Sequence, residues 1–397
     1  MTEYEEMMLD ANAVYRALLK SVENSKWKPS SQKAIIDCLD IVFDVLDKLR
    51  NRTYQGRIEN TFSIHERGRV RVIDSFCVED RTIRHILCDD ILLPKVRNKI
   101  IYDNGASIPG RGISHARNRI YAHLRKYYIH QGTNQGYILL GDYSKYYDNI
   151  FHNIAKEQLM ELVDYDEYLS WLIDKIFEAF DIDVSNLTDA ECEELYYGLF
   201  NKLEYEYVRS DNPEKTLHKS ISIGDQLSQV IGIYYPHEID NYVKIVRGQK
   251  YYGRYMDDWY VISDSKEELT DILEEANCRA LDLGLHLNLN KTHIAKINKT
   301  FKYLQNKYYL NEFGKVIIRI NPKRITDMRR RLKKLAKKVY NDDIPYEDVE
   351  SMFRSWMGSF YKVMSRDQRH NLIVLYEELF CVTILVQGNK MIFYKDY

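Results

Sequence analysis

The sequence predicts an α+β fold, in which an antiparallel sheet is combined with helices that form separate parts of the chain. Two observations predict strands: β-forming residues flank an acidic pair at 257–258, and an apolar run at 137–142 ends in an aspartate. A third observation predicts helices, because apolar residues recur every three or four positions within 1–50 and 323–339.

The acidic pair Asp257-Asp258 predicts a β-hairpin with two carboxylates at its tip. Like charges repel, and a fold keeps them beside a packed sheet mainly when a cation lies between them. A solvated surface turn is the alternative for this pair taken alone. Asp142, at the end of the apolar strand, could complete a site for two divalent metal ions. Oxygen ligands favour Mg²⁺, with Mn²⁺ as a second candidate.

Four residues, Tyr255-Met256-Asp257-Asp258, resemble the YxDD box of reverse transcriptases, and Asp142 followed by Tyr146-Tyr147-Asp148 is similar to their first catalytic motif. The resemblance runs from Arg57 to Gly358. It implies the right-hand polymerase fold, with fingers, a palm with an antiparallel sheet, and a helical thumb. The implied parts are an N-terminal helical extension (1–56), fingers (57–136), a palm (137–300, with a helical insert at about 155–215), and a primer grip with the thumb (301–397).

The composition restricts the protein's class. The chain has 397 residues, of which 29% are charged, and a net charge of −2, so any surface that binds nucleic acid has to be locally basic. No C-x-x-C pair occurs among the six cysteines, so the sequence predicts reduced core thiols and suggests neither a zinc site nor a disulfide framework. The N-terminus lacks a secretory pattern and no apolar run approaches membrane length, so we expect a cytoplasmic protein without a membrane partner.

The N-terminal part and the fingers come first in the chain. Residues 1–50 are expected to form two helices, which serve packing or RNA binding. Residues 61–76 predict a hairpin whose basic turn is followed by alternating Arg and Val, which places Arg67, Arg69 and Arg71 on one strand face. Guanidinium groups there can bind a triphosphate, and the resemblance assigns this contact to Arg71. The alternative is a solvated hairpin.

Before the first catalytic motif, the loop at 109–112 leads into a helix, where Arg111 and backbone N–H groups could accept a template phosphate. A plain helix cap explains the same pattern equally well.

In the palm, the resemblance implies a role for several residues. Asp142, Asp257, Asp258 and the Tyr143 carbonyl would hold the two metal ions, and Lys145 would contact the triphosphate. Tyr147 would lie under the sugar and exclude a 2′ hydroxyl, although ordinary packing is its alternative reading. Lys291 would act as a general acid toward pyrophosphate, or be a solvated loop lysine.

The box at 222–229 reads Ser-Ile-Gly-Asp-Gln-Leu-Ser-Gln. Gly224 would let the backbone approach the templating base pair closely, and Gln229 belongs to the same nucleotide-binding box. Its I-G-x-x-x-S-Q form resembles the diversity-generating retroelement branch of bacterial and phage reverse transcriptases. Related defence-associated (retron- or abortive-infection-like) enzymes also depart from the usual box.

The local basic charge predicted above occurs between 323 and 338, where nine residues are Lys or Arg. An apolar stripe at helical spacing lies opposite, which predicts a helix that packs on one face and follows phosphates with the other. A solvated charged face is the alternative. The residues expected to bind nucleic acid are Arg111, Lys323, Arg324, Arg330, Lys333, Lys334 and Lys337.

The favoured hypothesis is an RNA-directed DNA polymerase that makes cDNA in an antiphage defence system or a diversity-generating retroelement. Its expected partners are an RNA template, such as a dedicated noncoding RNA, a DNA or RNA primer, dNTPs, and an accessory protein or further copies of the chain. The alternatives are a catalytically inactive RNA-binding scaffold with the same fold, and a template-independent or RNA-synthesising polymerase. The intact acids speak against the scaffold, and Tyr147 speaks against RNA synthesis.

Overall fold

The computed structural model describes residues 2–66, 69–188, 190–191, 194–195, 216–387 and 390–395. The chain forms two compact units. The first comprises Met1–His123 and Ile138–Ile294, and the second comprises Leu124–Tyr137 and Ala295–Tyr397. Helix α7 (Ile113–Gln131) and strand β3 (Tyr137–Ser144) carry the chain from one unit to the other.

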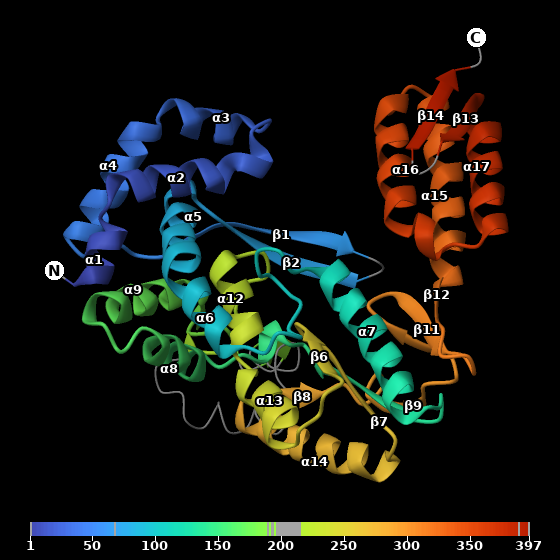
Figure 1. Cartoon of the computed structure of the whole chain (residues 1–397). Coiled ribbons are helices and arrows are strands. Elements are labelled where there is room, and N and C mark those ends of the chain that lie inside the picture. The colour runs from blue at the N-terminus through green and yellow to red at the C-terminus, as the bar shows by residue number, and fades with distance from the viewer. Residues whose placement is uncertain are drawn as a thin grey trace. The chain divides into compact units, whose positions relative to one another are not determined.

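The N-terminal extension is helical, but the expectation of two helices was wrong. It forms four helices: α1 (Glu3–Met8), α2 (Ala11–Val22), α3 (Pro29–Ile36) and α4 (Cys38–Arg50). The breaks have local causes, since the Asp10 carboxylate caps α2 at Asn12 N and Pro29 starts α3 without a donor N–H. Helix α2 packs on α4 and on α5 (Val78–His85), as Figure 1 shows.

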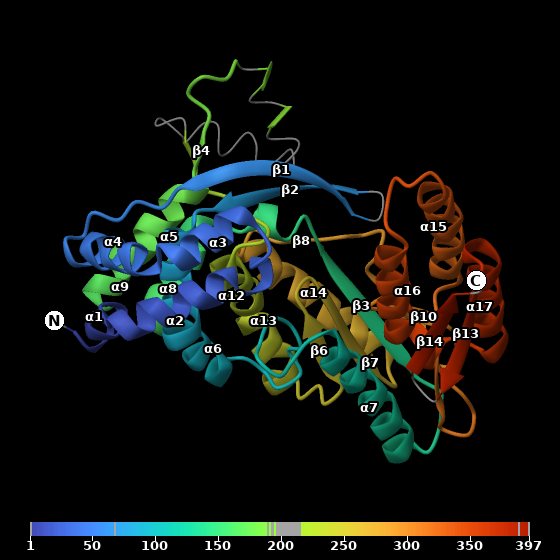
Figure 2. The same ribbon diagram turned by 90° about the horizontal axis from the view of Figure 1, so that it is seen from above.

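The predicted basic hairpin is confirmed. Strands β1 (Ile58–Glu66) and β2 (Arg69–Phe76) pair antiparallel, with Ile64 opposite Arg71, and form the long curved ribbon of Figure 2. Arg69 and Arg71 both belong to β2, two positions apart. The turn with Arg67 lies outside the described residues. After β2 the chain continues through α5, a π-helical segment (Ile86–Leu92) and α6 (Leu93–Lys99).

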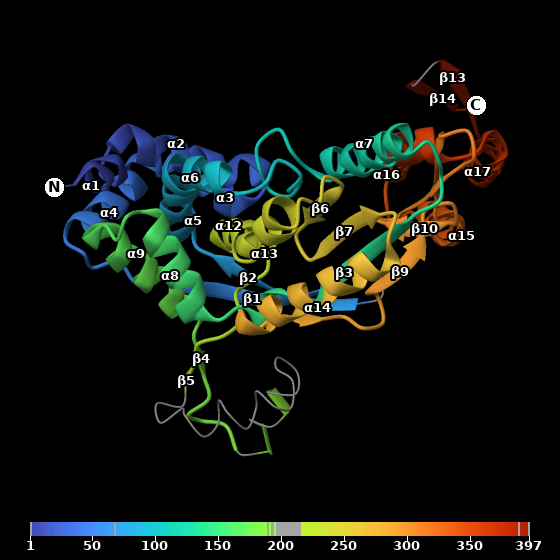
Figure 3. The ribbon, with the colours of Figure 1, turned by 60° about the horizontal axis from the view of Figure 1, so that its bottom comes forward.

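The centre of the first unit is a five-stranded sheet in the order β6-β7-β3-β8, with β9 also paired to β3. Its further strands are β6 (Tyr252–Tyr255), β7 (Asp258–Ser263), β8 (His286–Leu287) and β9 (His293–Lys296). Figure 3 shows the long helix α14 (Lys266–Asp282) beside this sheet, where it contacts β7 and β8. Helices α12 (Gln226–Tyr234) and α13 (His237–Asn241) and a π-helical segment (Tyr242–Val246) precede β6.

The predicted helical insert is only partly helical in the described residues. Helices α8 (His152–Leu162) and α9 (Glu167–Phe177) pack on each other, as expected. They are followed by a short antiparallel strand pair, β4 (Ile182–Asp183) with β5 (Thr216–Leu217), which the helical prediction missed. Two residues per strand are too few for a periodicity signal. Most of the rest of this insert lies outside the part of the chain that the structure describes.

The second unit combines a three-stranded sheet with a helical bundle. The sheet consists of β10 (Phe301–Tyr303), β11 (Asn306–Leu310) and β12 (Val316–Ile320). Helices α15 (Pro322–Tyr340), α16 (Tyr346–Phe360) and α17 (Arg366–Phe380) follow, with the hairpin β13 (Val382–Gln387) and β14 (Lys390–Lys395). Met328 and Leu332 bury the apolar stripe of α15 in the bundle core, where Phe353 stacks on Tyr376 at 4.3 Å. The predicted amphipathic helix is thus confirmed.

A search of the described helices for one with the length and apolar character that crossing a membrane requires finds none.

The sheet centre has no room for a side chain at Gly141, since a Cβ there would lie 2.1 Å from the Trp259 indole. Gly141→Ala should therefore destabilise the protein by about 1–3 kcal/mol, because the indole has to move within a packed core. Gly112→Ala is the matched control, because nothing lies within 4 Å of its Cβ position. Urea unfolding followed by tryptophan fluorescence measures both, and equal midpoints for the two variants would contradict the packing argument.

Candidate active site

The acidic pair lies at the tip of a hairpin, as predicted. Tyr255 pairs with Asp258, so Met256 and Asp257 form a two-residue turn between β6 and β7. Met256 has a φ of 54°, which is uncommon for a residue with a Cβ and is usually held by surrounding contacts. Contacts from residues outside the turn therefore have to hold this conformation. The turn in this conformation places Asp257 and Asp258 side by side.

Asp142 lies beside this turn, as the metal hypothesis requires. It belongs to β3, and its side chain is only 4% exposed. The next residue joins the hairpin directly, because Tyr143 N donates to Asp257 O at 3.2 Å. On the other side, Asn288 N donates to Asp142 O at 2.8 Å. The first of these backbone hydrogen bonds joins the segments of Asp142 and Asp257, which lie 115 positions apart in the sequence, and the second fixes Asp142 to the loop at 288.

The neighbouring carboxylates raise the pKa of Asp257 and of Asp258. Burial raises the pKa of Asp258 to about 7, with the charges of Asp257 and Asp142 adding to the effect. Burial and the Asp142 charge also raise the pKa of Asp257. Of the Asp142 oxygens, Oδ2 accepts from Lys291 Nζ at 2.5 Å, while Oδ1 is buried without a hydrogen-bond partner among the described residues. These groups therefore have the charge and the vacant ligand atom that a bound cation would satisfy.

A cavity of about 1130 Å³ opens at these acids, within the first unit. The predicted residues that line it are Arg71, Asp142, Tyr143, Lys145, Tyr147, Asp257 and Lys291. Arg71 comes from the basic hairpin, and its positive charge reaches Asp257 and Tyr147, where it lowers the pKa of both groups against the stronger effect of burial. The structure thus brings Asp142, Asp257 and three of the expected cations to one space large enough for a nucleotide, and Asp258 is the neighbour of Asp257 in the hairpin without lining the cavity itself.

Tyr147 is fixed between the hairpin tip and a helix. Its hydroxyl donates to Met256 Sδ at 3.7 Å, and it lies 2.9 Å from the position a Cβ would take at Gly232. Its ring meets that of Tyr146 edge-on at 5.5 Å. Burial raises the pKa of Tyr147, so the phenol stays neutral at physiological pH. The side chain is therefore a rigid, uncharged wall of the cavity.

The other predicted contacts are less directly placed. Gly224 precedes α12 with a φ of 102°, a conformation that suits glycine. Gln229, on α12, accepts a hydrogen bond from Ser107 Oγ at 2.6 Å. Arg111 donates to the carbonyls of Ile101 and Asn104 and lies over the Tyr102 ring, so in this structure its guanidinium holds its own loop together. The side chain of Arg69 lies outside the described part.

The cations predicted to follow nucleic acid lie on α15 of the second unit, where they form one surface. Arg324 is half-buried over the Phe360 ring at 4.9 Å, and the others are exposed: Lys323, Arg330, Lys333, Lys334 and Lys337. Helical spacing keeps them opposite the buried Met328 and Leu332.

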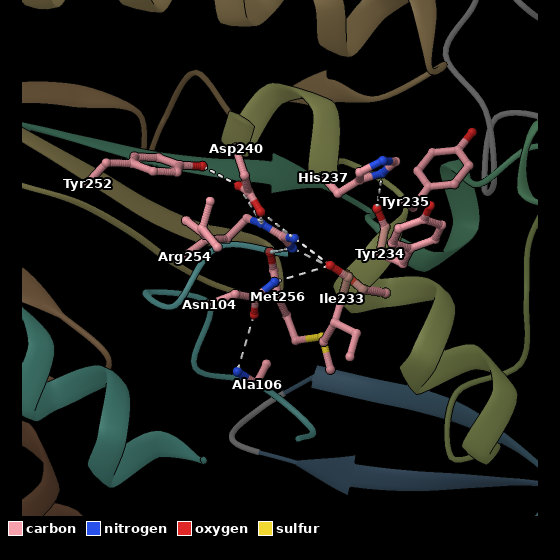
Figure 4. A network of polar contacts seen from close by, with 12 residues as sticks. Asn104, Ala106, Ile233, Tyr234, Tyr235, His237, Asp240, Tyr252, Arg254 and Met256 are labelled. Atoms are coloured by element: carbon pink, nitrogen blue, oxygen red, sulfur yellow. Dashed lines mark hydrogen bonds and ion pairs between the residues drawn. The ribbon is translucent and has the colours of Figure 1, made fainter. Parts of the chain in front are cut away.

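Sequence reasoning missed the residues that support the hairpin turn. Arg254 is fully buried and binds both oxygens of Asp240, with Nε at 2.9 Å from each. The same guanidinium donates to the carbonyls of Ile233 at 2.6 Å and Met256 at 3.0 Å (Figure 4). The one sequence signal was an arginine inside the otherwise apolar run 251–255, because an arginine is almost never fully buried unless it is paired.

Comparison with known proteins gives one family. Residues 60–306 match the family described as reverse transcriptase (RNA-dependent DNA polymerase). No curated protein matches the chain.

Solved structures that resemble the chain include a telomerase from Candida albicans, in complex with a TWJ fragment of telomeric RNA. Its TM-score is 0.44 at 14% identity, over 84% of this chain and 60% of that one. An apo telomerase from Candida tropicalis, truncated from its C-terminal domain, has a TM-score of 0.41 at 14% identity, over 69% of this chain and 59% of that one. The chain therefore spans less than two thirds of the length of these telomerases.

The raised pKa of Asp258 makes the stability of the metal-free protein depend on pH. The folded state keeps this proton up to about pH 7, whereas an unfolded aspartate loses it near pH ~4, so stability should fall as the pH rises between these values. Asp258→Asn should remove much of that fall and make the protein roughly 2 kcal/mol more stable than the wild type at pH 8.

Urea unfolding in EDTA at pH 5, 7 and 8 measures this dependence. The control is Glu274→Gln, which removes an exposed carboxylate from α14 and should leave the slope unchanged. A slope for Asp258→Asn equal to that of the wild type would show that the acids at the hairpin tip do not oppose one another.

Proposed function

The chain belongs to the reverse transcriptase family, and from this premise we propose that it synthesises DNA on an RNA template by metal-dependent nucleotidyl transfer. Its fold is the right-hand polymerase fold of that family, whose members are RNA-directed DNA polymerases. The observation that carries the proposal is the meeting of Asp142 and Asp257 at one cavity, with Asp258 within reach of both charges and one carboxylate oxygen of Asp142 buried without a partner.

The residues present fit two Mg²⁺ ions, or Mn²⁺. Asp142, Asp257 and Asp258 would hold the ions with the carbonyl of Tyr143, which gives the all-oxygen ligand set that these metals prefer. The bound ions supply activation of a 3′ hydroxyl and stabilisation of charge on the leaving pyrophosphate. Without such ions the acids repel one another, which is the cause of the raised pKa of Asp257 and of Asp258 beyond burial.

The remaining cavity residues have separate tasks in this proposal. Arg71 and Lys145, with Arg69 from the same strand as Arg71, orient the triphosphate through their positive charges. Tyr147 fills the space that a ribose 2′ hydroxyl would need. Lys291 Nζ, now bound to Asp142 Oδ2, is placed at the acids and can deliver a proton to the leaving group.

We assign the handling of template and primer to surfaces outside the acids. Gly224 would approach the templating pair, Gln229 would contribute from the same box, and Arg111 would contact the template after leaving its loop carbonyls. Residues 57–136 would act as fingers, 137–300 as palm and 301–397 as primer grip and thumb. The exposed cations of α15 would follow the nucleic-acid backbone, which explains how a chain with a net charge of −2 binds a polyanion.

The biological role we propose is cDNA synthesis in an antiphage defence system, with a dedicated noncoding RNA as template. The I-G-x-x-x-S-Q box supports a bacterial or phage enzyme of the defence-associated or diversity-generating branches. The near-neutral charge favours defence over retrohoming, because diversity-generating enzymes are usually basic and work with a cationic accessory protein. The second candidate, a catalytically inactive RNA-binding scaffold, is separated from the first by the following experiment.

Asp257→Asn should lower incorporation of dNTPs on a primed RNA template in Mg²⁺ by about a hundredfold or more, because it removes a metal-binding charge. Primer extension measures the rate. The matched control is Asp282→Asn at the exposed end of α14, which should extend primers like the wild type. A wild-type protein that binds the primed template but incorporates nothing would favour the scaffold, and full activity in Asp257→Asn would refute this site.

Tyr147→Ala should let the enzyme accept rNTPs, with the ratio of rNTP to dNTP incorporation rising tenfold or more, because the ring no longer occupies the 2′ position. Tyr147→Phe is the control, since it keeps the ring and loses only the hydroxyl that meets Met256 Sδ. Single-nucleotide insertion kinetics give the ratio. An unchanged ratio in the alanine variant would mean that another residue selects the sugar.

A further inference from the structure

A second group of potential metal ligands lies apart from the acids. In the described part of the chain, His152, Asp181 and His218 are a group of three whose ligand atoms all lie within 4.8 Å of one another. His152 begins α8, Asp181 directly precedes β4, and His218 directly follows β5. Since β4 and β5 pair and His152 N donates to His218 O, the three side chains meet between this strand pair and the start of α8.

The hydrogen bonds of His152 determine which of its nitrogens is free to bind a cation. Nε2 lies 2.6 Å from the carbonyl oxygen of Ser220, and a carbonyl only accepts, so Nε2 carries the proton. In a neutral imidazole Nδ1 then carries a lone pair, and it points at Asp181 Oδ1 at 3.0 Å. Two acceptors at this distance repel unless a cation lies between them.

The same carboxylate oxygen receives a second imidazole. His218 Nδ1 lies 2.8 Å from Asp181 Oδ1, so two ring nitrogens converge on a single oxygen. The His152 side chain is 2% exposed and donates its other N–H to a backbone carbonyl, which is the usual arrangement of a metal-binding histidine.

We propose that His152 Nδ1, Asp181 and His218 Nδ1 bind one Zn²⁺ ion, with water in the fourth position. Two imidazoles and a carboxylate suit zinc, whereas Mg²⁺ prefers oxygen ligands alone, so this site and the acids at 142, 257 and 258 select different metals. The His218 side chain is 54% exposed, which gives the ion a route from solvent.

The bound ion fixes the wall of the cavity. His152 N donates to His218 O at 2.9 Å, and Ser220 N donates to Ile150 O at 3.0 Å, so the segment after β5 runs along the start of α8. One residue on, Ile221 N donates to Tyr147 O at 3.2 Å. The zinc ion therefore ties the stem of the segment 182–217 to the backbone of the residue that faces the sugar.

The test uses the full-length protein without nucleic acid, stripped with EDTA and then given Zn²⁺ alone. After desalting, elemental analysis should find one zinc ion per chain in the wild type, and affinity should fall about a hundredfold or more in His218→Asn. Co²⁺ in place of Zn²⁺ should give the visible absorption of a four-coordinate ion, lost in Asp181→Asn. Hydrogen exchange at the amides of Ser220 and Ile221 should slow on zinc addition in the wild type only.

Two controls separate this site from others. His370→Asn, an exposed histidine of α17, should bind zinc like the wild type. Asp142→Asn should also keep the zinc ion, so the result does not depend on whether the polymerase proposal holds. The proposal is overturned if folded wild type retains no zinc, if His218→Asn retains it equally, or if Asp142→Asn loses it, which would place the ion at the acids instead.

Discussion

The buried guanidinium of Arg254 is the constraint on which the site depends. A charge out of contact with water requires partners for all its donors, and here the Asp240 carboxylate and the carbonyls of Gly232, Ile233 and Met256 provide them. Burial alone would lower the pKa of Arg254, but the Asp240 carboxylate raises it, so the guanidinium stays charged. One side chain thus joins β6, the end of α12, α13 and the hairpin turn.

This network supports the hairpin turn without neutralising the carboxylates at its tip. The Arg254 charge is matched by Asp240, so the carboxylates at the hairpin tip keep their mutual repulsion, and the pKa of Asp258 rises to about 7. Lys291 donates a hydrogen bond to only one of the two carboxylate oxygens of Asp142. The protein therefore builds a rigid backbone under its acids and leaves their charge to be satisfied from outside, which is the arrangement a cation-dependent site requires.

The sequence predicted those parts that depend on local pattern. The acidic hairpin follows from the β-forming residues that flank Asp257-Asp258, the amphipathic helix predicted at 323–338 follows from periodicity, and both are present; the strand expected to end at Asp142 is present and continues to Ser144. The count of N-terminal helices was wrong because two helices need one break, whereas the chain breaks three times at single residues inside a continuous helical pattern: at Asp10, which caps α2, at Pro29, which starts α3, and at Asp37, which separates α3 from α4. Arg254 with Asp240 and the His152 cluster could not be predicted, since their partners lie 14 to 66 positions apart and no spacing marks them.

The residues that line the cavity therefore come from two kinds of segment: the motifs that carry the family resemblance, and the ends of the insert. The acids and the hairpin turn come from motifs that resemble the family's boxes. Arg254 holds the turn through its hydrogen bond to the carbonyl of Met256. Residues 181–183 and 220–223 also line the cavity, on either side of a long insert. Tyr147 contacts both kinds of segment, through Met256 Sδ and through Ile221 N. The segment after β5 is thus joined to the backbone of Tyr147 by one hydrogen bond, whereas the acids are tied to β3, β7 and the Arg254 network.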